Sequence, residues 1–411
     1  MQPLRFATAG SVDDGKSTLI GRLLYDARAI HDDQLVAVER ASLRRGAAEI
    51  DLSLLTDGLE AEREQGITID VAYRYFTSGR RKFIIADSPG HEQYTRNMAT
   101  GASNADALVL LVDVRKGLLA QTRRHLLIAR LLGLRQALVF VNKMDLVGYA
   151  EDVFARLSAQ IEAFGASLGF ARLVLIPGSA LRGDMVVDRG AALGWYQGPT
   201  LLEGLERLDS TAEAALAGPL RFPVQLVSRP HGNVPRAYMG RIESGHLLAG
   251  TEVLTFPGGR RSRVRQIVAH GSEREIGVAG DSISVVLADD IDLARGDLIA
   301  DPYRPPRELR SLEVTLIWLG GEPLRLGARY AVQQAARRVP AKVASVASRL
   351  DIQTLEEASA EGDVTANDIV KARLSLQTPL FVDSYETVRS MGALILIDEA
   401  TNHTVAAALV R

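Results

Sequence analysis

The sequence contains no cysteine in 411 residues. This absence excludes disulfide bonds, thiolate catalysis and sulfur-ligated metals, and it fits a reducing compartment. Apolar runs are also short: those at 107–112 and 392–397 lie far below the roughly 20 residues that a membrane-spanning helix needs. A strand and a glycine-rich loop follow the first residues directly, which leaves no room for a secretory signal. We therefore expect a soluble, cytoplasmic protein without membrane association.

Neither positively nor negatively charged residues are in large excess. The chain has 48 lysine and arginine residues against 50 aspartate and glutamate residues, a formal net charge of -2. It therefore lacks the global basic field that non-specific nucleic-acid binding usually needs, and we expect no nucleic-acid partner. The seven histidines show no metal-ligand spacing. With 47% hydrophobic residues and this length, the chain should form two or three globular domains.

Short apolar runs alternate with longer segments of helical period over the first half of the chain. Runs buried on both faces are typical of parallel strands, so this alternation predicts a mostly parallel sheet wrapped by helices, a doubly wound α/β domain at 1–215. The expected strands are 5–9, 83–86, 107–112, 137–141 and 173–176, and the expected helices are 17–24, 121–132 and 151–168.

The pattern changes near residues 214–223. Beyond them, strand-like pieces recur at short intervals with glycine punctuation and without helical spacers, as in barrels and sandwiches. A stiff linker is expected at 301–307, where three of seven residues are proline. We therefore predict two β-barrel domains, at 216–304 and 305–411.

Residues 10–17 read GSVDDGKS and satisfy the phosphate-loop pattern G-x-x-x-x-G-K-[ST] between an expected strand and an expected helix. The glycines let backbone N–H groups point inward around phosphates, and Lys16 brings a positive charge to the outer phosphates. The Ser17 hydroxyl can ligate Mg2+. An ordinary glycine-rich turn is the alternative, against which the flanking strand and helix argue. The predicted nucleotide contacts are Gly10, Ser11, Val12, Asp13, Asp14, Gly15, Lys16, Ser17 and Thr18.

Two further segments have the features of a nucleotide switch. In Asp87-Ser88-Pro89-Gly90, which follows an apolar strand, Asp87 can hold a magnesium-bound water and the Gly90 N–H can sense a γ-phosphate. Thr68, which lies between the phosphate-loop helix and the next strand, can complete magnesium coordination in the triphosphate state and release it after hydrolysis. The predicted metal ligands are Ser17, Thr68 and Asp87.

The segment Asn142-Lys143-Met144-Asp145 follows a buried strand and predicts which base is bound. The Asp145 carboxylate can accept hydrogen bonds from guanine N1–H and the 2-amino group, whereas adenine offers it no such pair, so we expect GTP rather than ATP. The segment 179–181 follows the next strand, where a backbone N–H can meet guanine O6. The predicted contacts here are Asn142, Lys143, Asp145, Ser179, Ala180 and Leu181.

These elements in this order, followed by two β domains, resemble the translation-factor class of GTPases, of which elongation factor Tu is the familiar member. Within that class the motif sequences are similar to those of the large subunit of bacterial sulfate adenylyltransferase. Asp14 discriminates most sharply, because translation factors typically have histidine at this place in the loop, whereas the sulfate enzyme has G-S-V-D-D-G-K. The segments that carry the closer resemblance are 10–26, 62–76, 87–103, 198–203 and 295–300.

The resemblance implies a heterodimer in which a small catalytic subunit binds ATP and sulfate and makes adenosine 5'-phosphosulfate and pyrophosphate. GTP hydrolysis on this chain would drive that reaction, with GTP and Mg2+ as cofactors. His91 matches the histidine that positions the attacking water, a task suited to an imidazole that is not a strong base. The alternative is an elongation-factor-like GTPase that delivers aminoacyl-tRNA.

Three further segments are expected at the surface. The arginines of 260–265 and the pair Arg337-Arg338 are expected on solvent-exposed strand faces, and a contact with an acidic partner or nucleic acid is the alternative. The helix after the second switch, with Tyr94, Arg96, Asn97 and Met98, is expected to meet the small subunit, because a nucleotide-dependent signal must leave through a moving element.

Overall fold

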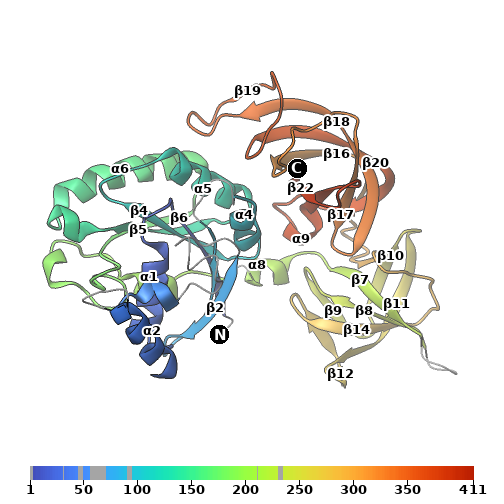
Figure 1. Cartoon of the computed structure of the whole chain (residues 1–411). Coiled ribbons are helices and arrows are strands. Elements are labelled where there is room, and N and C mark those ends of the chain that lie inside the picture. Colours follow the sequence, from blue (N-terminus) through green and yellow to red (C-terminus); the bar gives the residue numbers. More distant parts are fainter. Residues whose placement is uncertain are drawn as a thin grey trace. The chain divides into compact units, whose positions relative to one another are not determined.

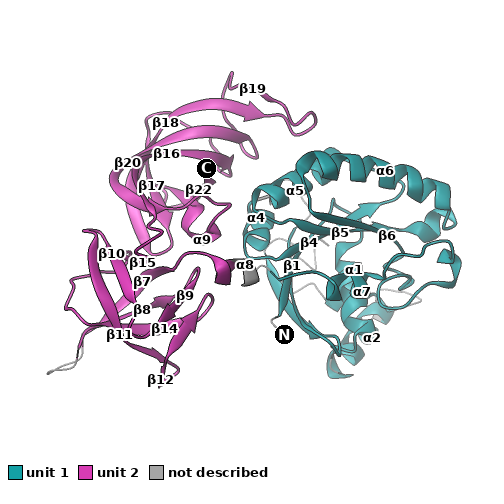
Figure 2. Cartoon of the chain, turned by 180° about the vertical axis from the view of Figure 1, so that it is seen from behind, with its two compact units in different colours: residues 1–210 teal, residues 211–411 magenta. Residues whose placement is uncertain are grey.

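The computed structural model in Figure 1 describes residues 3–30, 32–44, 50–55, 71–89, 95–210, 212–229 and 235–411. It divides into two compact units, residues 1–210 and 211–411, which are coloured separately in Figure 2. Each unit is built differently from the other. The division into three domains with boundaries after 215 and 304 stays a prediction.

The first unit is built on a six-stranded sheet in the order β2-β3-β1-β4-β5-β6. All neighbouring strands are parallel except β2 and β3, which run antiparallel. Every residue of β4 is buried, as expected for a central strand covered on both faces. The predicted parallel sheet is confirmed. The strands are β1 (Leu4–Ala9), β2 (Ala72–Thr77), β3 (Lys82–Asp87), β4 (Ala107–Asp113), β5 (Gln136–Asn142) and β6 (Arg172–Pro177).

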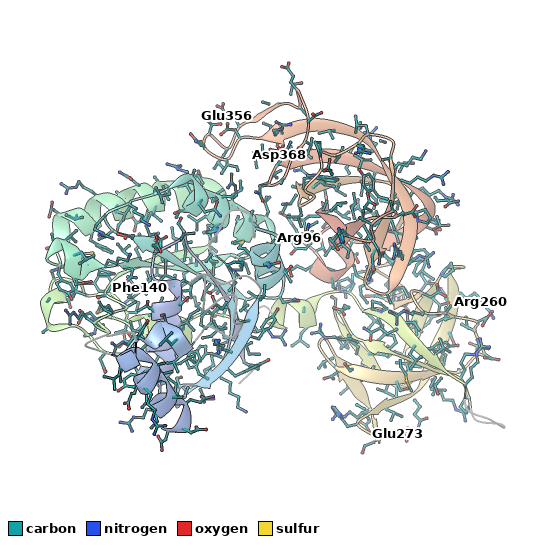
Figure 3. All side chains as sticks on the ribbon, viewed as in Figure 1. Arg96, Phe140, Arg260, Glu273, Glu356 and Asp368 are labelled. Carbon is teal, nitrogen blue, oxygen red and sulfur yellow. The ribbon has the colours of Figure 1, made fainter. Side chains whose placement is uncertain are left out.

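Helices cover both faces of this sheet. Figure 1 shows α5 and α6 on one face and α1 on the other. The core between the layers is apolar, and Phe140, labelled inside the first unit in Figure 3, is fully buried. The helices are α1 (Lys16–Asp26), α2 (Asp32–Arg44), α4 (Thr95–Ser103), α5 (Ala120–Leu131), α6 (Glu151–Leu168) and α7 (Leu201–Glu206), with short 3-10 turns η1 (Leu52–Leu55), η3 (Met144–Val147) and η4 (Ala191–Leu193).

Local sequence explains where several helices begin and end. The Thr200 hydroxyl accepts from the Glu203 N–H at 3.2 Å and the Glu203 carboxylate accepts from the Thr200 N–H at 3.1 Å, a capping box that starts α7. Helix α6 has Glu151 and Asp152 in its first turn, where negative charge complements the helix dipole. It ends at Gly169, whose φ of 75° is the left-handed conformation that glycine adopts without strain.

The second unit contains two closed six-stranded barrels. In the first, strands run in the order β10-β15-β7-β8-β14-β11, and a further β10–β11 pairing closes the ring. Closure leaves no unpaired strand edge within the ring, and apolar side chains fill its interior. Its strands are β7 (Arg221–Ser228), β8 (Ala237–Arg241), β10 (Glu252–Phe256), β11 (Arg260–Ala269), β14 (Ser282–Leu287) and β15 (Leu298–Ala300), with β9 (His246–Leu248), β12 (Ser272–Arg274) and β13 (Ile276–Val278) beside them.

The second barrel has the order β17-β21-β22-β16-β20-β18 and is closed by a β17–β18 pairing. The prediction of two β-barrels after an α/β domain is therefore confirmed. The strands of this barrel are β16 (Arg307–Trp318), β17 (Arg329–Gln334), β18 (Arg337–Leu350), β20 (Ile369–Val382), β21 (Ala393–Asp398) and β22 (Thr404–Val410), with β19 (Glu357–Ser359) beside β18; the helices of the unit are α8 (Ala212–Ala217) and α9 (Arg389–Gly392).

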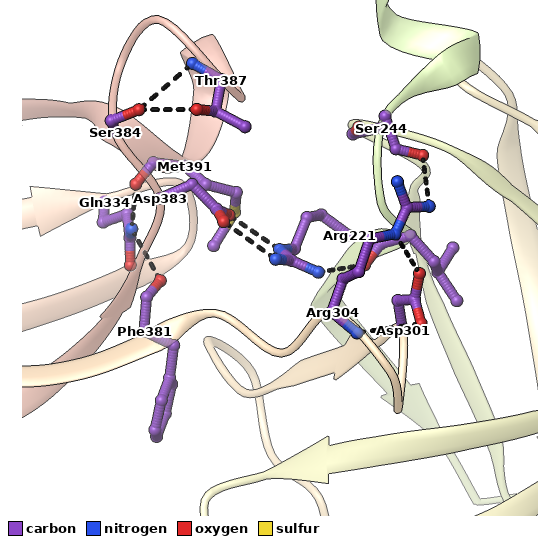
Figure 4. Close-up of polar contacts among 12 residues, drawn as sticks. Arg221, Ser244, Asp301, Arg304, Gln334, Phe381, Asp383, Ser384, Thr387 and Met391 are labelled. Carbon is purple, nitrogen blue, oxygen red and sulfur yellow. Dashed lines mark hydrogen bonds and ion pairs between the residues drawn. The ribbon is translucent and has the colours of Figure 1, made fainter.

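The two barrels of this unit share a buried contact, drawn in Figure 4. Arg221 of β7 donates to both carboxylate oxygens of Asp383, just after β20, at 2.7 and 2.8 Å. Phe256 of β10 packs on Phe381 of β20 with ring centroids 5.0 Å apart. Ion pair and rings together join strands of both barrels.

Arg337 contributes to the same contact. It pairs with Asp297 at 3.1 Å and lies over the Phe381 ring at 5.1 Å, and its side chain is 20% exposed. The expectation of a solvent-exposed strand face was therefore wrong for Arg337, because this end of β18 packs against residues of the first barrel.

The other basic strand behaves as predicted. In β11 the exposed Arg261, Arg263 and Arg265 alternate with the buried Ser262 and Val264. Figure 3 labels the neighbouring Arg260 on the outside of this barrel. Arg261 is paired with Glu252 of the adjacent strand at 3.0 Å, which suits an ordinary polar face.

None of the described helices is long and apolar enough to cross a membrane.

Candidate nucleotide-binding site

The candidate site lies where the parallel strands of the first unit end. Because parallel strands point the same way, the loops after β1, β3, β4, β5 and β6 meet along one edge of the sheet, the usual ligand-binding edge of open α/β sheets. This edge brings the phosphate loop, Asp87, Asp113, the segment 142–145 and the segment 179–181 together.

The phosphate loop follows β1 and leads into α1. Asp13 and Gly15 have φ angles of 65° and 93°, so the chain takes left-handed turns on both sides of Asp14. A Cβ added to Gly15 would lie 2.5 Å from Asn142 Nδ2, which leaves room for glycine alone. The loop therefore has its tight shape for two reasons, backbone angle and close approach.

Lys16 and Asp87 are in direct contact. The Lys16 Nζ lies 2.8 Å from Asp87 Oδ1, and the Thr8 hydroxyl donates to the same oxygen at 3.1 Å. Both charged side chains are nearly buried. The structure thus places Lys16, predicted to bind the phosphates, beside Asp87, predicted to bind magnesium.

The donor set fits Mg2+, which prefers hard oxygen ligands and keeps several waters. Among the described residues, no donor is bonded to Asp87 Oδ2, so this oxygen is available to a cation. The Ser17 side chain, in the first turn of α1, is only partly buried and can offer its hydroxyl oxygen. Thr68, the third predicted ligand, lies outside the described residues.

Asn142 ties the two halves of the site together. Its Nδ2 donates to the Asp14 carbonyl at 2.7 Å, and its Oδ1 accepts from the Ala180 N–H at 2.9 Å. It therefore bridges the phosphate loop and the segment 179–181. Two backbone N–H groups of that segment, in which one N–H was predicted to meet guanine O6, already have acceptors, because Ala180 donates to Asn142 and Ser179 donates to Asp184. Sequence spacing could not reveal this bridge, because the hydrogen-bonded residues are 128 and 38 positions apart.

Lys143 also contacts the phosphate loop. Its ammonium group donates to the Asp13 carbonyl and lies 3.0 Å from Asp113 Oδ2. Its φ of 65° starts the short turn η3, which carries Asp145. Within the described residues, no side chain donates to the Asp145 carboxylate, so its acceptors are available for a base.

The loop beside Asp145 is held by a further pair that sequence analysis missed. The Tyr149 hydroxyl donates to the Asp184 carboxylate, and the Ser179 N–H donates to the Asp184 carbonyl at 3.2 Å. Burial and Asp184 raise the pKa of Tyr149, so it stays a donor. Leu181 is 53% exposed, and its carbonyl accepts from Arg22 at 2.6 Å.

Acidic and basic groups at the end of β4 were also missed. Burial acts to raise the pKa of Asp113, but hydrogen bonds from Arg115 and Lys143 outweigh it and hold the pKa well below its usual range. Burial raises the pKa of Asp14 to about 6, although the Ser11 N–H and Lys116 act in the opposite direction. Asp113 and Lys116, at the end of β4, therefore act on Asp14 within the phosphate loop.

Several predicted residues lie outside the described residues: Thr68, Gly90, His91 and Tyr94. Of the helix that was expected to meet a partner, Arg96 is exposed, but Met98 is fully buried against the first unit's interior. Met98 therefore belongs to the core and was wrongly counted as surface.

Two family models match the chain. One is described as the elongation factor Tu GTP binding domain and matches residues 2–216; the other is described as GTP-eEF1A C-terminal domain-like and matches residues 311–411. The sulfate adenylyltransferase subunit 1 of Aeromonas hydrophila subsp. hydrophila is 47% identical over 409 residues, 99% of this chain and 86% of that protein. The protein of the same name from Shewanella oneidensis is 48% identical over 413 residues, 99% of this chain and 85% of that protein.

The chain belongs to the sulfate adenylyltransferase subunit 1 family. Its first half is accordingly a GTP-binding domain, and the chain is the GTPase subunit of this enzyme type, as the motifs predicted. A solved structure of Sup35 complexed with GMPPNP is 24% identical, with a TM-score of 0.45, and covers 100% of this chain and 93% of that chain. That likeness is too low to add to the family assignment.

Proposed function

We propose that GTP hydrolysis on this chain drives the formation of adenosine 5'-phosphosulfate and pyrophosphate from ATP and sulfate, the first step of sulfate assimilation. The adenylyl transfer itself takes place on a smaller catalytic subunit, with which this chain forms a heterodimer in the cytoplasm. The observation that carries the proposal is the 47% identity to sulfate adenylyltransferase subunit 1 over 99% of this chain. It is combined with a phosphate loop and an N-K-x-D segment on one edge of the sheet.

The residues of the site divide the work of holding GTP. The phosphate loop and the N-terminus of α1 present N–H groups to the phosphates, and Lys16 adds a positive charge. Asp145 accepts from guanine and thereby rejects adenine. Ser17 and Asp87 would hold Mg2+, which neutralises developing charge on the phosphates when it is bound.

Two proposed roles fall on residues outside the described part of the chain. Thr68 would supply a further oxygen ligand to Mg2+ in the triphosphate state, and His91 would orient the water that attacks the γ-phosphate. His91→Ala should lower the GTPase rate far more than GTP affinity, because a water-positioning group acts mainly in the transition state. An equal loss in affinity would make His91 structural.

The elongation-factor alternative shares the fold and the switch. The GTP-binding domain alone does not separate this alternative from the sulfate enzyme. The relatives from Aeromonas hydrophila and Shewanella oneidensis, which are 47% and 48% identical to this chain, carry the sulfate enzyme's name. No observation on this chain favours delivery of aminoacyl-tRNA.

GTP turnover by the purified chain tests the proposal. One set of reactions contains the small subunit, ATP and sulfate, and the matched set contains ribosomes and aminoacyl-tRNA. Stimulation that requires ATP and sulfate together is the expected result. Stimulation only in the set with ribosomes and aminoacyl-tRNA would leave the assignment of the GTP site intact and overturn the proposed coupling to sulfate activation.

Base selection by Asp145 has its own test. Asp145→Asn exchanges a carboxylate acceptor for an amide, so affinity should shift from GTP toward xanthosine triphosphate. Competition binding with both nucleotides measures the shift. Unchanged GTP preference would contradict the assignment of Asp145 to the base while leaving the phosphate loop untouched.

A further inference from the structure

Asp14 is an acidic residue inside a loop that binds anions. It is 1% exposed, and one carboxylate oxygen, Oδ2, accepts from the Ser11 N–H at 2.7 Å. The other oxygen, Oδ1, is buried and, in the described part of the chain, has no hydrogen-bond partner. A buried negative charge repels phosphates and is costly by itself, so a cation must offset it if the loop is to bind a triphosphate well.

Of the cations that the structure describes, Lys116 is the nearest to that orphaned oxygen. Its Nζ lies 3.8 Å from Asp14 Oδ1 and donates to the Val12 carbonyl at 2.9 Å. The turn after β4 brings it there, because the N–H groups of Lys116 and Gly117 donate to the Asp113 carbonyl at 3.0 and 3.1 Å. The turn's other basic residue, Arg115, is bonded to the Asp113 carboxylate instead.

The hydrogen bond to Val12 also orients the loop. In a planar trans peptide, the carbonyl of one residue and the N–H of the next point in opposite directions. Holding the Val12 carbonyl toward Lys116 therefore turns the Asp13 N–H away from that lysine. Lys143 holds the next carbonyl, that of Asp13, from the β5 side. Two lysines from different strand ends thus fix two successive carbonyls of the phosphate loop.

We propose that Lys116 is a positioning residue for GTP binding: it offsets the buried charge of Asp14 and holds the Val12 carbonyl, so that a phosphate loop with an internal aspartate can accept a triphosphate. The inference rests on the proposed assignment of this loop to the phosphates. Among the described residues, Asp113 and Lys143 also act on Asp14, in opposite directions, and they form an ion pair with each other.

Equilibrium binding of GTP, GDP and guanosine to the full chain tests the proposal. The variants are Lys116→Met, Lys116→Arg, Asp14→Asn and the double variant Lys116→Met with Asp14→Asn. Lys116→Met should weaken GTP binding about tenfold, which corresponds to about 1.4 kcal/mol, and should leave guanosine binding unchanged. Lys116→Arg keeps the charge and should retain most of the affinity.

The decisive readout is the coupling between the two positions. Asp14→Asn keeps an acceptor for the Ser11 N–H but removes the charge, and its own GTP affinity is the reference for the second background. In that background Lys116→Met should cost less than about threefold, a non-additivity expected of residues in contact. Because Lys116 is 36% exposed, its replacement should leave the fold intact, and melting curves of each variant check this.

Three outcomes would overturn the inference: unchanged GTP affinity in Lys116→Met, the same fold-loss in both backgrounds, or an equal loss for guanosine. The first two would remove the link to Asp14, and the third would make the role structural. A full chain that binds no GTP at all would instead contradict the proposed function, so the two failures are distinguishable.

Discussion

Arg221 is a nearly fully buried arginine whose ion pair with Asp383 joins the two barrels of the second unit. Arg221→Met keeps much of the side-chain volume but leaves the Asp383 carboxylate, 11% exposed, without its partner. Removing one member of a buried pair costs about 3–5 kcal/mol. We take the lower end, about 3 kcal/mol, because Asp383 retains some contact with water. For a unit of about 200 residues, each kcal/mol lowers the melting temperature by about 2–4 °C, so it should fall by about 6–12 °C.

Calorimetry of the full chain measures this shift, with Arg373→Met as the matched control. Arg373 pairs with Glu313 across β20 and β16 at 3.0 Å, but both side chains are more than half exposed, so its loss should cost less than about 1 kcal/mol. The double variant Arg221→Met with Asp383→Leu removes both buried charges and should recover most of the stability. A shift no larger than that of the control, or a double variant as unstable as the single one, would refute the reasoning.

Three further predictions concern the first unit. Burial, with smaller contributions from Arg124 and Lys16, lowers the pKa of His125 to about 3; since the unfolded chain takes up a proton near pH 6.5 that the folded chain refuses, stability should fall by about 1.4 kcal/mol per pH unit below 6.5, and His125→Leu should remove that slope in melting curves between pH 7 and 5. Tyr149→Phe removes the hydrogen bond to Asp184 beside Asp145, so the Kd for GTP should rise about tenfold while turnover at saturating GTP stays the same; an unchanged Kd would show that the pair does not support base binding. Gly15→Ala should destabilise the loop by about 1–2 kcal/mol from the left-handed φ alone, before the clash with Asn142, and nucleotide titration should show impaired binding; normal GTP affinity would contradict the geometry of the phosphate loop.

The motifs were predictable from sequence because their signals are local. The phosphate loop needs only eight consecutive residues between a strand and a helix, and the N-K-x-D segment needs four after a buried strand. The order of the parallel strands was not needed to find either one. The apolar runs also predicted the strands well, with β4 expected at 107–112 and observed as Ala107–Asp113.

Partner choices among side chains could not be predicted in the same way. Lys116 and Val12 are 104 positions apart, and Arg221 and Asp383 are 162 apart. Arg337 looked like one more exposed arginine, because alternation along a strand does not say what packs against either face. Its position over Phe381 depends on how the two barrels of the second unit meet.

The sequence by itself determined the ligand class and the sequence of folds along the chain: a GTP-type phosphate loop in an α/β domain, then two β-barrels. It could do so because the hydrophobic periodicity of strands and helices, and the short motifs, depend only on residues close together in the chain. The tertiary structure decided which side chains support the site, with Asn142 as a bridge and Lys116 beside Asp14. The reason is the strand order β3-β1-β4-β5, which brings loops from distant parts of the chain to one edge of the sheet.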